Sequence, residues 1–293
     1  MSQTAREQAV PADQNLEQDV AAHYGRDDLF AAIEAALIAA GKDMAALAPA
    51  DLAAVDEFHI GGRPATVHFA DSVGFAAGAR LLDIGCGIGG ASRYFASERG
   101  CHVTGIDLTA AYCDAARRLA ALTGLADRTD YREASALDLP FEAGSFDGAY
   151  MLHVGMNIAD KSRLFREVRR VLRPGARFGI YDVLQGPGGA PLFPVPWATG
   201  PQTSFLVTAD ALQGLLRAVG FEILTVVDRT DFARDFMQAA RRRQVQQQAE
   251  GRGAPPLGLH LLMGRGTPAK VTNMARSLEE GRIAPTEMVV QAV

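Results

Sequence analysis

The sequence has few cysteines, a single tryptophan and no long hydrophobic run. Its three cysteines, Cys86, Cys101 and Cys113, lack the spacing of metal ligands, and their odd number cannot form a closed set of disulfides. We expect them to be small buried residues in a reducing cytoplasm. The most apolar segment, FAAIEAALIAAG, is short and carries Glu34, and the polar start has no signal-peptide layout. The sequence therefore predicts a cytoplasmic protein that does not cross a membrane.

The chain also lacks an excess of positive charge. Its formal net charge is -5, whereas nucleic-acid binding depends on clustered lysine and arginine. The one basic run, residues 241–243, lies among glutamines and is typical of a solvated helix face. These features disfavour a nucleic-acid partner and favour a small molecule, and they leave a homo-oligomer possible.

Hydrophobic periodicity divides the chain into four parts. Residues 1–18 are polar and aperiodic and are predicted to be a disordered tail, and residues 19–77 a helical N-terminal cap. From residue 78 to 267 strands alternate with helices, which predicts an α/β, doubly wound, mostly parallel sheet. The late run LGLHLLMG at 257–264 is predicted to join it as an antiparallel strand. Residues 268–293 are predicted to form a C-terminal helix for packing or dimer contact.

One long connection interrupts this alternation. Residues 185–206 are rich in glycine and proline and contain the only tryptophan, Trp197. Connections of this length within a compact domain are usually functional or disordered. Because the prolines stiffen the backbone, we expect an ordered lid after the fifth strand.

The stretch LLDIGCGIGG, residues 81–90, matches the dinucleotide fingerprint with Gly85, Gly87 and Gly90, yet Asp83 precedes it by two residues. A pyrophosphate on the following helix would meet that carboxylate at roughly 6 Å, at a cost of about 3 kcal/mol for an effective dielectric of about 20. With a ligand that carries a sulfonium and an ammonium group, the interaction with this carboxylate is attractive instead. Asp107, at the end of VTGID, identifies a ribose, which a nicotinamide dinucleotide would also present.

Four blocks in order, LLDIGCGIGG, VTGIDLT, ASALDLPFEAGSFDGAY and VLRPGARFGIYD, resemble the class I S-adenosylmethionine-dependent methyltransferases over residues 80–184. The resemblance implies a seven-stranded sheet of order 3-2-1-4-5-7-6 with strand 7 antiparallel. It also implies S-adenosylmethionine as cofactor, with S-adenosylhomocysteine as product, and no metal. The residues that it assigns to cofactor binding are Asp83, Gly85, Gly87, Gly89, Asp107, Leu108, Ser135 and Ala136. Ser135 stands where many members have an acidic residue for the adenine amino group.

The methyl acceptor is less defined. The segment MLHVGMNIADK lacks the N/D-P-P-Y type motif of DNA amino-methyltransferases. The motifs HYG, FHIGGRPAT, MNIADK and PVPWA resemble the small-molecule branch containing sarcosine and dimethylglycine N-methyltransferases and, more distantly, tocopherol and quinone methyltransferases. The acceptor candidates are Tyr24, His59, Arg63, His153 and Trp197, with the aromatic ring of Phe205 as a further cation–π surface.

These observations favour methylation of an amine nitrogen by direct displacement, because a neutral amine needs no strong base. An alternative is O- or C-methylation of a phenolic or quinone-like metabolite, with His153 as the base. Two alternatives lie outside this class of enzyme: a noncatalytic cofactor-binding regulator and a nicotinamide oxidoreductase. The sequence leaves the acceptor's identity and the number of methyl groups open.

Overall fold

The computed structural model describes residues 12–24, 28–253 and 255–293. In this part of the chain one seven-stranded sheet has the order β3-β2-β1-β4-β5-β7-β6. Strands β1 to β5 pair in parallel, and β7 runs antiparallel to both β5 and β6. The strands are β1 (Arg80–Ile84), β2 (His102–Asp107), β3 (Thr129–Glu133), β4 (Phe146–Leu152), β5 (Leu172–Gln185), β6 (Phe221–Asp228) and β7 (Ile283–Ala292). The predicted fold class and strand order are confirmed.

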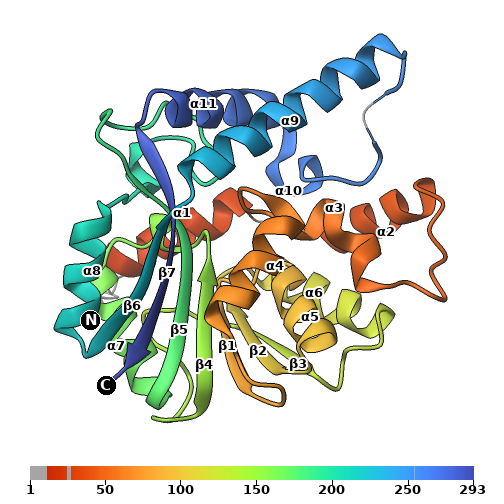
Figure 1. The fold of residues 1–293 in the computed structure, drawn as a ribbon. Helices are drawn as coiled ribbons and strands as arrows, with labels where there is room; N and C mark the ends of the chain where they lie inside the picture. Colours follow the sequence, from red (N-terminus) through yellow and green to blue (C-terminus); the bar gives the residue numbers. More distant parts are fainter. Residues whose placement is uncertain (1–11, 25–27, 254) are drawn as a thin grey trace, which may run out of the picture.

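Helices cover both faces of this sheet (Figure 1). They are α1 (Ala12–Tyr24), α2 (Leu29–Ala39), α3 (Ala53–Asp56), α4 (Gly62–Val73), α5 (Gly90–Glu98), α6 (Ala110–Leu122), α7 (Lys161–Val171), α8 (Ala209–Ala218), α9 (Thr230–Ala249), α10 (His260–Met263) and α11 (Thr267–Glu279). Short 3-10 turns are η1 (Pro49–Leu52), η2 (Gly155–Asn157), η3 (Pro201–Thr203) and η4 (Gly264–Gly266). None of the helices formed by the described residues has the length and apolar character needed to cross a bilayer.

The central strands are apolar on both faces because helices cover both sides of the sheet. In β1, Leu82 packs with the residues of α7 and α8, whereas Leu81 packs with those of α4 and α5. In β4, Met151 packs with the residues of α7 and α8, and Tyr150 packs with those of α4 and α5. Parallel sheets buried on both faces require such runs, and each fully buried large apolar side chain stabilises the fold by about 1.5–3 kcal/mol.

The prediction of a strand at 257–264 is wrong. His260–Met263 forms α10, and Leu257 and Leu262 pack against the cluster that contains α2. The antiparallel strand is β7, at the C-terminus, so the predicted C-terminal helix ends at Glu279 and a strand follows it. Strand β7 lies between β5 and β6, which buries both of its faces and explains its run of apolar residues.

The prediction of disorder for residues 1–18 is also wrong where the structure describes them. Helix α1 begins at Ala12, and its Leu16 and Val20 line the main cavity of the protein. Residues 1–11 lie outside the described part. Only a narrow stripe of α1 is apolar and most of the helix is polar, so periodicity alone could not reveal it.

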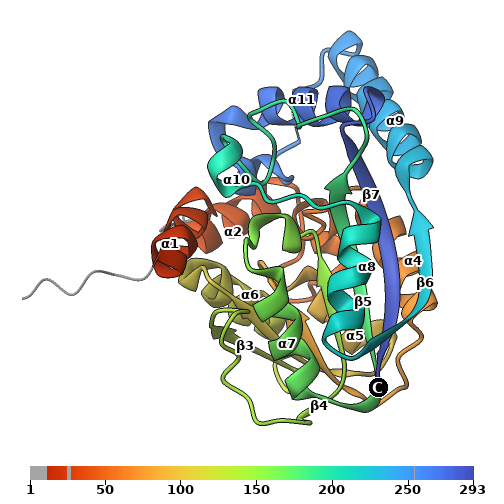
Figure 2. The same cartoon turned by 90° about the vertical axis from the view of Figure 1, so that its left-hand side faces the viewer.

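Helices α9, α10 and α11 lie across one end of the sheet, above α1 (Figures 1 and 2). Residues 185–206 pack in the same region: Trp197 is buried with Ile60 and Leu278, and the Leu192 N–H donates to Ser277 Oγ at 2.9 Å. The layer over this end of the sheet therefore combines segments from the start, the middle and the end of the chain.

The predictions for the three cysteines and for the basic run are both confirmed. The three cysteines are free and buried, as expected. The basic run 241–243 is exposed on α9, which confirms that it is a solvated helix face.

Candidate active site

The glycine loop between β1 and α5 borders a cavity of about 400 Å³. Gly85, Gly87 and Gly89 all have positive φ, at 69°, 53° and 79°. A Cβ on Gly85 would overlap a methyl of Val154, and one on Gly89 would lie 2.6 Å from the hydroxyl of Tyr131. A Cβ on Gly87 would have no atom within 4 Å. Packing thus requires glycine at the two outer positions, and the middle position leaves its backbone accessible from the cavity.

Asp107, at the end of β2, connects the glycine loop to the next helix. Its Oδ2 accepts a hydrogen bond from the Gly87 N–H, and its Oδ1 accepts one from the Thr109 N–H, both at 2.9 Å. Burial raises the pKa of this carboxyl, and the two backbone donors oppose the increase. The side chain lines the cavity at the end of β2, and two ribose hydroxyls fit this arrangement.

Asp83 lies in β1, just before the loop, and is almost fully buried. Its Oδ2 accepts a hydrogen bond from Ser92 Oγ at 2.6 Å, and burial raises its pKa to about 7. A cationic ligand beside this carboxyl would favour its ionised form, whereas a diphosphate would oppose ionisation. Its place in the cavity lining therefore suits a positively charged group.

The third part of the predicted cofactor site lies after β3. Leu108 and Ala136 line the cavity, but Ser135 is not among the described residues that do. The Ser135 hydroxyl donates to Glu17 Oε1 of α1 and accepts from the Leu137 N–H at 3.0 Å. Glu17 itself lines the cavity. It brings a carboxylate next to Ser135, and it is absent from the predicted site because residues 1–18 were predicted to be disordered.

His153 stands at the end of β4 and lines the same cavity. It is the one non-glycine residue with positive φ, 55°, in the described part of the chain. The ring nitrogen Nδ1 lies 3.2 Å from the Tyr181 carbonyl, to which it can only donate, and Nε2 accepts from the Ile60 N–H at 3.3 Å. Burial, with a smaller effect of His59, lowers its pKa to about 3. Both ring nitrogens of this neutral imidazole are therefore engaged.

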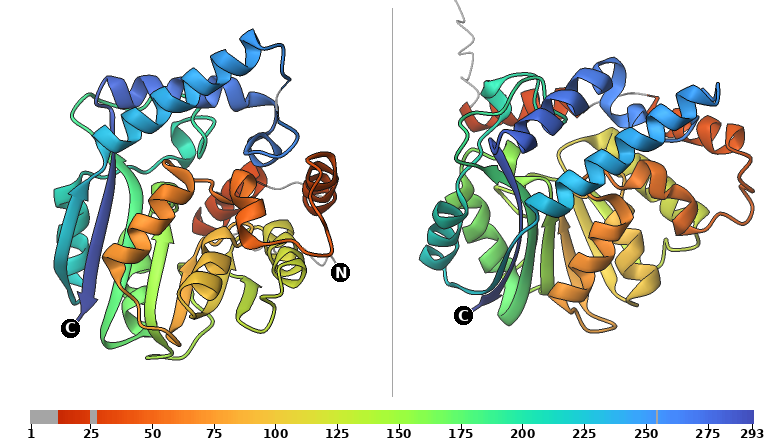
Figure 3. Two further views of the ribbon diagram at one scale, coloured as in Figure 1. Left: turned by 45° about the vertical axis from the view of Figure 1, so that its right-hand side comes forward. Right: turned by 45° about the horizontal axis from the view of Figure 1, so that its top comes forward.

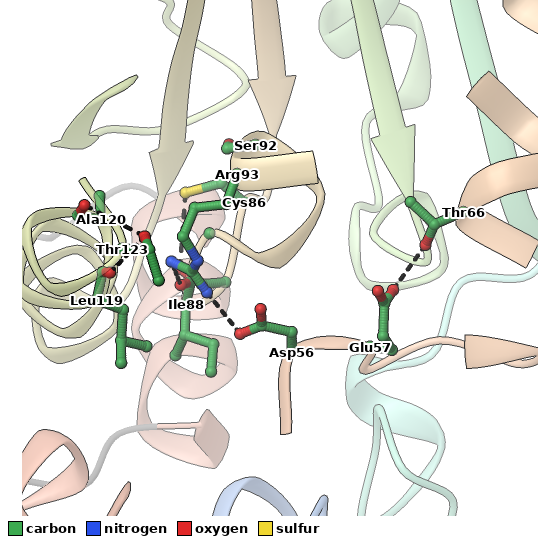
Figure 4. Close-up of polar contacts among 12 residues, drawn as sticks. Asp56, Glu57, Thr66, Cys86, Ile88, Ser92, Arg93, Leu119, Ala120 and Thr123 are labelled. Carbon is green, nitrogen blue, oxygen red and sulfur yellow. Dashed lines mark hydrogen bonds and ion pairs between the residues drawn. The ribbon is translucent and has the colours of Figure 1, made fainter. Parts of the chain in front are cut away.

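His59 lies beside His153, with ring centroids 5.9 Å apart, and also lines the cavity. Its Nε2 is 3.1 Å from Thr66 Oγ1, which in turn donates to Glu57 Oε2 at 2.6 Å (Figure 4). Burial lowers the pKa of His59. Because the Thr66 hydroxyl proton is directed to Glu57, its oxygen is left to accept a hydrogen bond from His59.

Arg63 points away from the cavity. Its guanidinium lies 3.3 Å from Glu57 Oε1 and 4.4 Å from the ring centroid of Tyr94, and the residue is not among the described cavity-lining residues. Arg63, one of the acceptor candidates, therefore has a carboxylate partner within the protein itself.

Of the three predicted aromatic residues, two line the cavity. Tyr24 and Trp197 line the cavity, whereas Phe205 is not among its described lining residues. The Tyr24 hydroxyl donates to Asn157 Oδ1 at 3.1 Å, and Asn157 Nδ2 donates to the carbonyls of Trp197 and Thr203 at 2.8 Å each. Asn157, which is not among the predicted acceptor residues, thus joins α1 to the 185–206 segment.

A buried ion pair that the sequence did not reveal also borders the cavity. Arg93 Nη2 lies 2.5 Å from Asp56 Oδ1, and Nη1 donates to the Ile88 carbonyl at 2.8 Å (Figure 4). The other oxygen of Asp56 has no hydrogen-bond partner among the described residues, and burial raises the pKa of this carboxyl to about 6. Asp56 lines the cavity, and its carboxylate is buried there against Arg93.

No three described histidine, cysteine, aspartate or glutamate residues gather in a way that could hold a metal ion. The glycine loop, the accessible Gly87, and the carboxylates of Asp83 and Asp107 instead fit a nucleoside that carries a positive charge.

Comparison with known proteins agrees with this geometry. Residues 82–180 match a family model described as a methyltransferase domain. An O-methyltransferase of Aspergillus sclerotiorum is 31% identical over 60% of this chain and 67% of its own. The chloroplastic tocopherol O-methyltransferase of Arabidopsis thaliana is 42% identical over 34% of this chain and 29% of its own.

A solved phosphoethanolamine N-methyltransferase 2 of Haemonchus contortus, in complex with phosphomonomethylethanolamine and S-adenosylhomocysteine, superposes with a TM-score of 0.65. It is 21% identical, and the match covers 80% of this chain and 54% of the other. This chain thus spans between about a third and two thirds of the length of these three relatives. With the four sequence blocks, the sheet order and the family match together, the chain belongs to the class I methyltransferases, and its cofactor is S-adenosylmethionine.

Proposed function

We propose that the protein transfers a methyl group to an amine nitrogen of a small molecule bound in the 400 Å³ cavity. The charge of the lining carries this proposal. The ionisable acids along the wall include Asp56, Asp83 and Asp107, and no lysine or arginine lines it among the described residues. Asp56 is already paired with Arg93, so the charge that remains for a ligand is that of Asp83 and Asp107, which can stabilise both a sulfonium donor and the ammonium ion that forms on the acceptor.

The residues of the glycine loop and its neighbours would hold the cofactor. The backbone at Gly85 and Gly87, near Asp83, would take the methionine part, and Asp107 the ribose hydroxyls. Leu108 would pack against adenine, with Ala136 and Glu17 at its edge, where Glu17 accepts a hydrogen bond from the Ser135 hydroxyl. When bound, the cofactor supplies an electrophilic methyl group on positively charged sulphur.

The remaining residues of the site orient the acceptor and exclude water. Tyr24, Asn157 and Trp197 form a hydrogen-bonded connection that closes α1 over the 185–206 segment. The acceptor is thereby held for in-line attack, and orientation accounts for most of the acceleration in such displacements. The acceptor nitrogen must lose its proton before it attacks, because only the neutral amine carries the lone pair.

The state of His153 favours nitrogen over oxygen. A phenol must lose its proton, and a base for this step needs a free lone pair within reach. Both nitrogens of His153 are engaged with backbone groups, and its pKa of about 3 makes it a weak base. An amine attacks without such a base, which agrees with the arrangement of this residue.

O-methylation is the second candidate, because the Aspergillus and Arabidopsis relatives are both named O-methyltransferases. It would require His153 to release the Ile60 N–H, or His59 to act in its place. The variant His153→Ala separates the two candidates. We expect cofactor binding to be retained in both cases and turnover to fall less than about 10-fold for an amine, against about 100-fold or more for a phenol that needs a general base.

The direct test is incubation of the full chain with methyl-labelled S-adenosylmethionine and a metabolite extract, followed by mass spectrometry. Label on nitrogen supports the proposal, and label confined to oxygen or carbon contradicts it. Asp107→Ala serves as the matched control, because it should remove labelling of every acceptor by weakening cofactor binding.

A further inference from the structure

The last helices of the chain build an apolar part of the cavity wall. We refer to it as the acceptor wall, which consists of Phe236, Met237, Ala240, Leu259, Leu262, Met263, Val271 and Met274. These residues come from α9, α10, α11 and the connection before α10, which lie together over one end of the sheet (Figure 3). Within residues 230–253 and 255–279 every cavity-lining side chain that the structure describes is apolar.

Nearby cations are engaged outside the cavity. Lys161 Nζ donates to three backbone carbonyls at 2.6 to 2.8 Å, and Lys270 Nζ lies 3.3 Å from a carbonyl oxygen and 3.5 Å from the His23 ring. Arg93 is paired with a buried aspartate, and Arg63 with a buried glutamate. Since each group already has its partners, none is available to neutralise an anionic ligand.

An anionic acceptor packed on the acceptor wall would therefore have no counter-charge among the side chains that the structure describes. Burial of an unpaired carboxylate or phosphate in apolar surroundings is strongly unfavourable. In addition, Asp83 and Asp107 line the same cavity and in their ionised form would repel it. The acceptor wall thus selects against phosphorylated, diphosphorylated and carboxylated acceptors, whereas the carboxylate of the cofactor would lie at the glycine loop.

The acceptor wall also indicates what the cavity favours. Met237, Met263 and Met274 belong to it, and Met156 lines the cavity from η2. Methionine side chains are unbranched and adaptable, so they can pack against apolar ligands of irregular shape. Resting on the proposed amine methylation, we infer that the acceptor is a hydrophobic amine with no anionic group, whose alkyl, prenyl or ring system packs on this wall.

The test is a calorimetric titration of the full chain saturated with S-adenosylhomocysteine. The probes are decylamine, 10-aminodecanoic acid and butylamine, each below its aggregation concentration. We expect decylamine to bind at least about 100-fold more tightly than 10-aminodecanoic acid, which adds only a carboxylate, and at least about 10-fold more tightly than butylamine. Equal binding of any two of these, or no binding of decylamine, would overturn the inference. Failure of S-adenosylhomocysteine to bind would instead overturn the cofactor site and the proposed function.

Two variants of the wall sharpen the result. Met237→Arg and Met274→Arg each place a cation opposite the ligand, so we expect binding of 10-aminodecanoic acid to strengthen at least about 10-fold while decylamine binding is lost. Val226→Arg, on the exposed edge strand β6, adds the same charge away from the cavity and should change neither. Unchanged preferences in both wall variants, with S-adenosylhomocysteine still bound, would contradict the assignment of this wall to the acceptor.

Discussion

The glycine loop between β1 and α5 and the acceptor wall of α9, α10 and α11 face the same cavity, but different interactions hold them in place. The loop is fixed by backbone hydrogen bonds, from the Cys86 N–H to the Ile106 carbonyl and from the Gly87 N–H to Asp107, both at 2.9 Å. The wall is held by side-chain packing, with Leu262 against the cluster of α2 and Met274 against that of Trp197.

These two kinds of support constrain the sequence differently. A loop whose conformation depends on positive φ admits few residues, so its function is readable from a short motif. A wall made of apolar side chains tolerates exchanges that conserve volume, so the same helices can accept different ligands. Relatives of one fold can therefore share a cofactor and differ in acceptor.

The largest effect is expected from removal of the ribose carboxylate. In Asp107→Ala the two hydroxyls lose a charged acceptor and the Gly87 N–H loses its partner, so S-adenosylhomocysteine should bind about 100-fold or more weakly. Calorimetry measures this loss. Asp130→Ala, at an exposed position on β3, is the control and should leave binding intact. An unchanged affinity in Asp107→Ala would remove the ribose assignment.

The steric role of the loop is tested by Gly85→Ala. The added methyl would overlap Val154 at a φ of 69°, so we expect cofactor affinity to fall about 30-fold and the melting temperature to decrease. Gly124→Ala is a matched control, because Gly124 has the same φ of 69° but no neighbour within 4 Å of an added Cβ. It should cost stability by strain alone, about 1 kcal/mol, and leave affinity unchanged. Equal loss of affinity in both variants would show that strain, not contact with Val154, limits the loop.

A smaller effect is expected where α1 meets the cofactor side. If Glu17 accepts a hydrogen bond at the adenine edge, either directly or through Ser135, Glu17→Gln should reduce the preference for S-adenosylhomocysteine over S-inosylhomocysteine about 10-fold. Competition binding measures this ratio. Asp19→Asn, at an exposed position of the same helix, should preserve it. An unchanged ratio in Glu17→Gln would assign this residue a purely structural role.

The smallest effect concerns pH. Burial raises the pKa of Asp83 to about 7, so the carboxyl is protonated below this pH and ionised above it. We expect the affinity for cationic S-adenosylmethionine, relative to neutral-sulphur S-adenosylhomocysteine, to increase several-fold as pH rises through about 7. Asp83→Asn should flatten this ratio. A ratio that does not change with pH in the native protein would show that Asp83 does not sense the sulfonium charge.

Ionisation of Asp83 increases the affinity for the cationic cofactor but decreases the stability of the fold. Because its pKa is higher in the folded than in the unfolded protein, the folded state binds more protons between about pH 4 and 7, and this contribution to stability decreases as pH rises through that window. Asp56 and Asp182, with pKa values raised to about 6 and about 7, act in the same direction. Chemical denaturation at several pH values would detect it, and the Asp83→Asn variant should lose part of the slope.

The structure brings most residues of the predicted cofactor site to one cavity, whereas Arg63 and Phe205 of the predicted acceptor site are not among its described lining residues. Asp83, Gly85 and Asp107 lie where the motif indicated, because strand ends of a parallel sheet meet at one edge. Arg63 was an acceptor candidate, but it pairs with Glu57, a partner that composition could not reveal. Glu17, Asp56 and Asn157 were missed because their roles depend on segments far away in the chain.

By itself, the sequence determined the alternation of strands and helices, the glycine conformations of the loop and the acids at the ends of β1 and β2. These features follow from local periodicity and from the φ angles that each residue allows. Only the tertiary structure decided that residues 12–18 form a helix, that the run at 257–264 packs on α2, and that β7 is at the C-terminus. An apolar run does not specify its own partner, and only packing against distant segments decides whether it becomes a helix, a strand or the wall of a cavity.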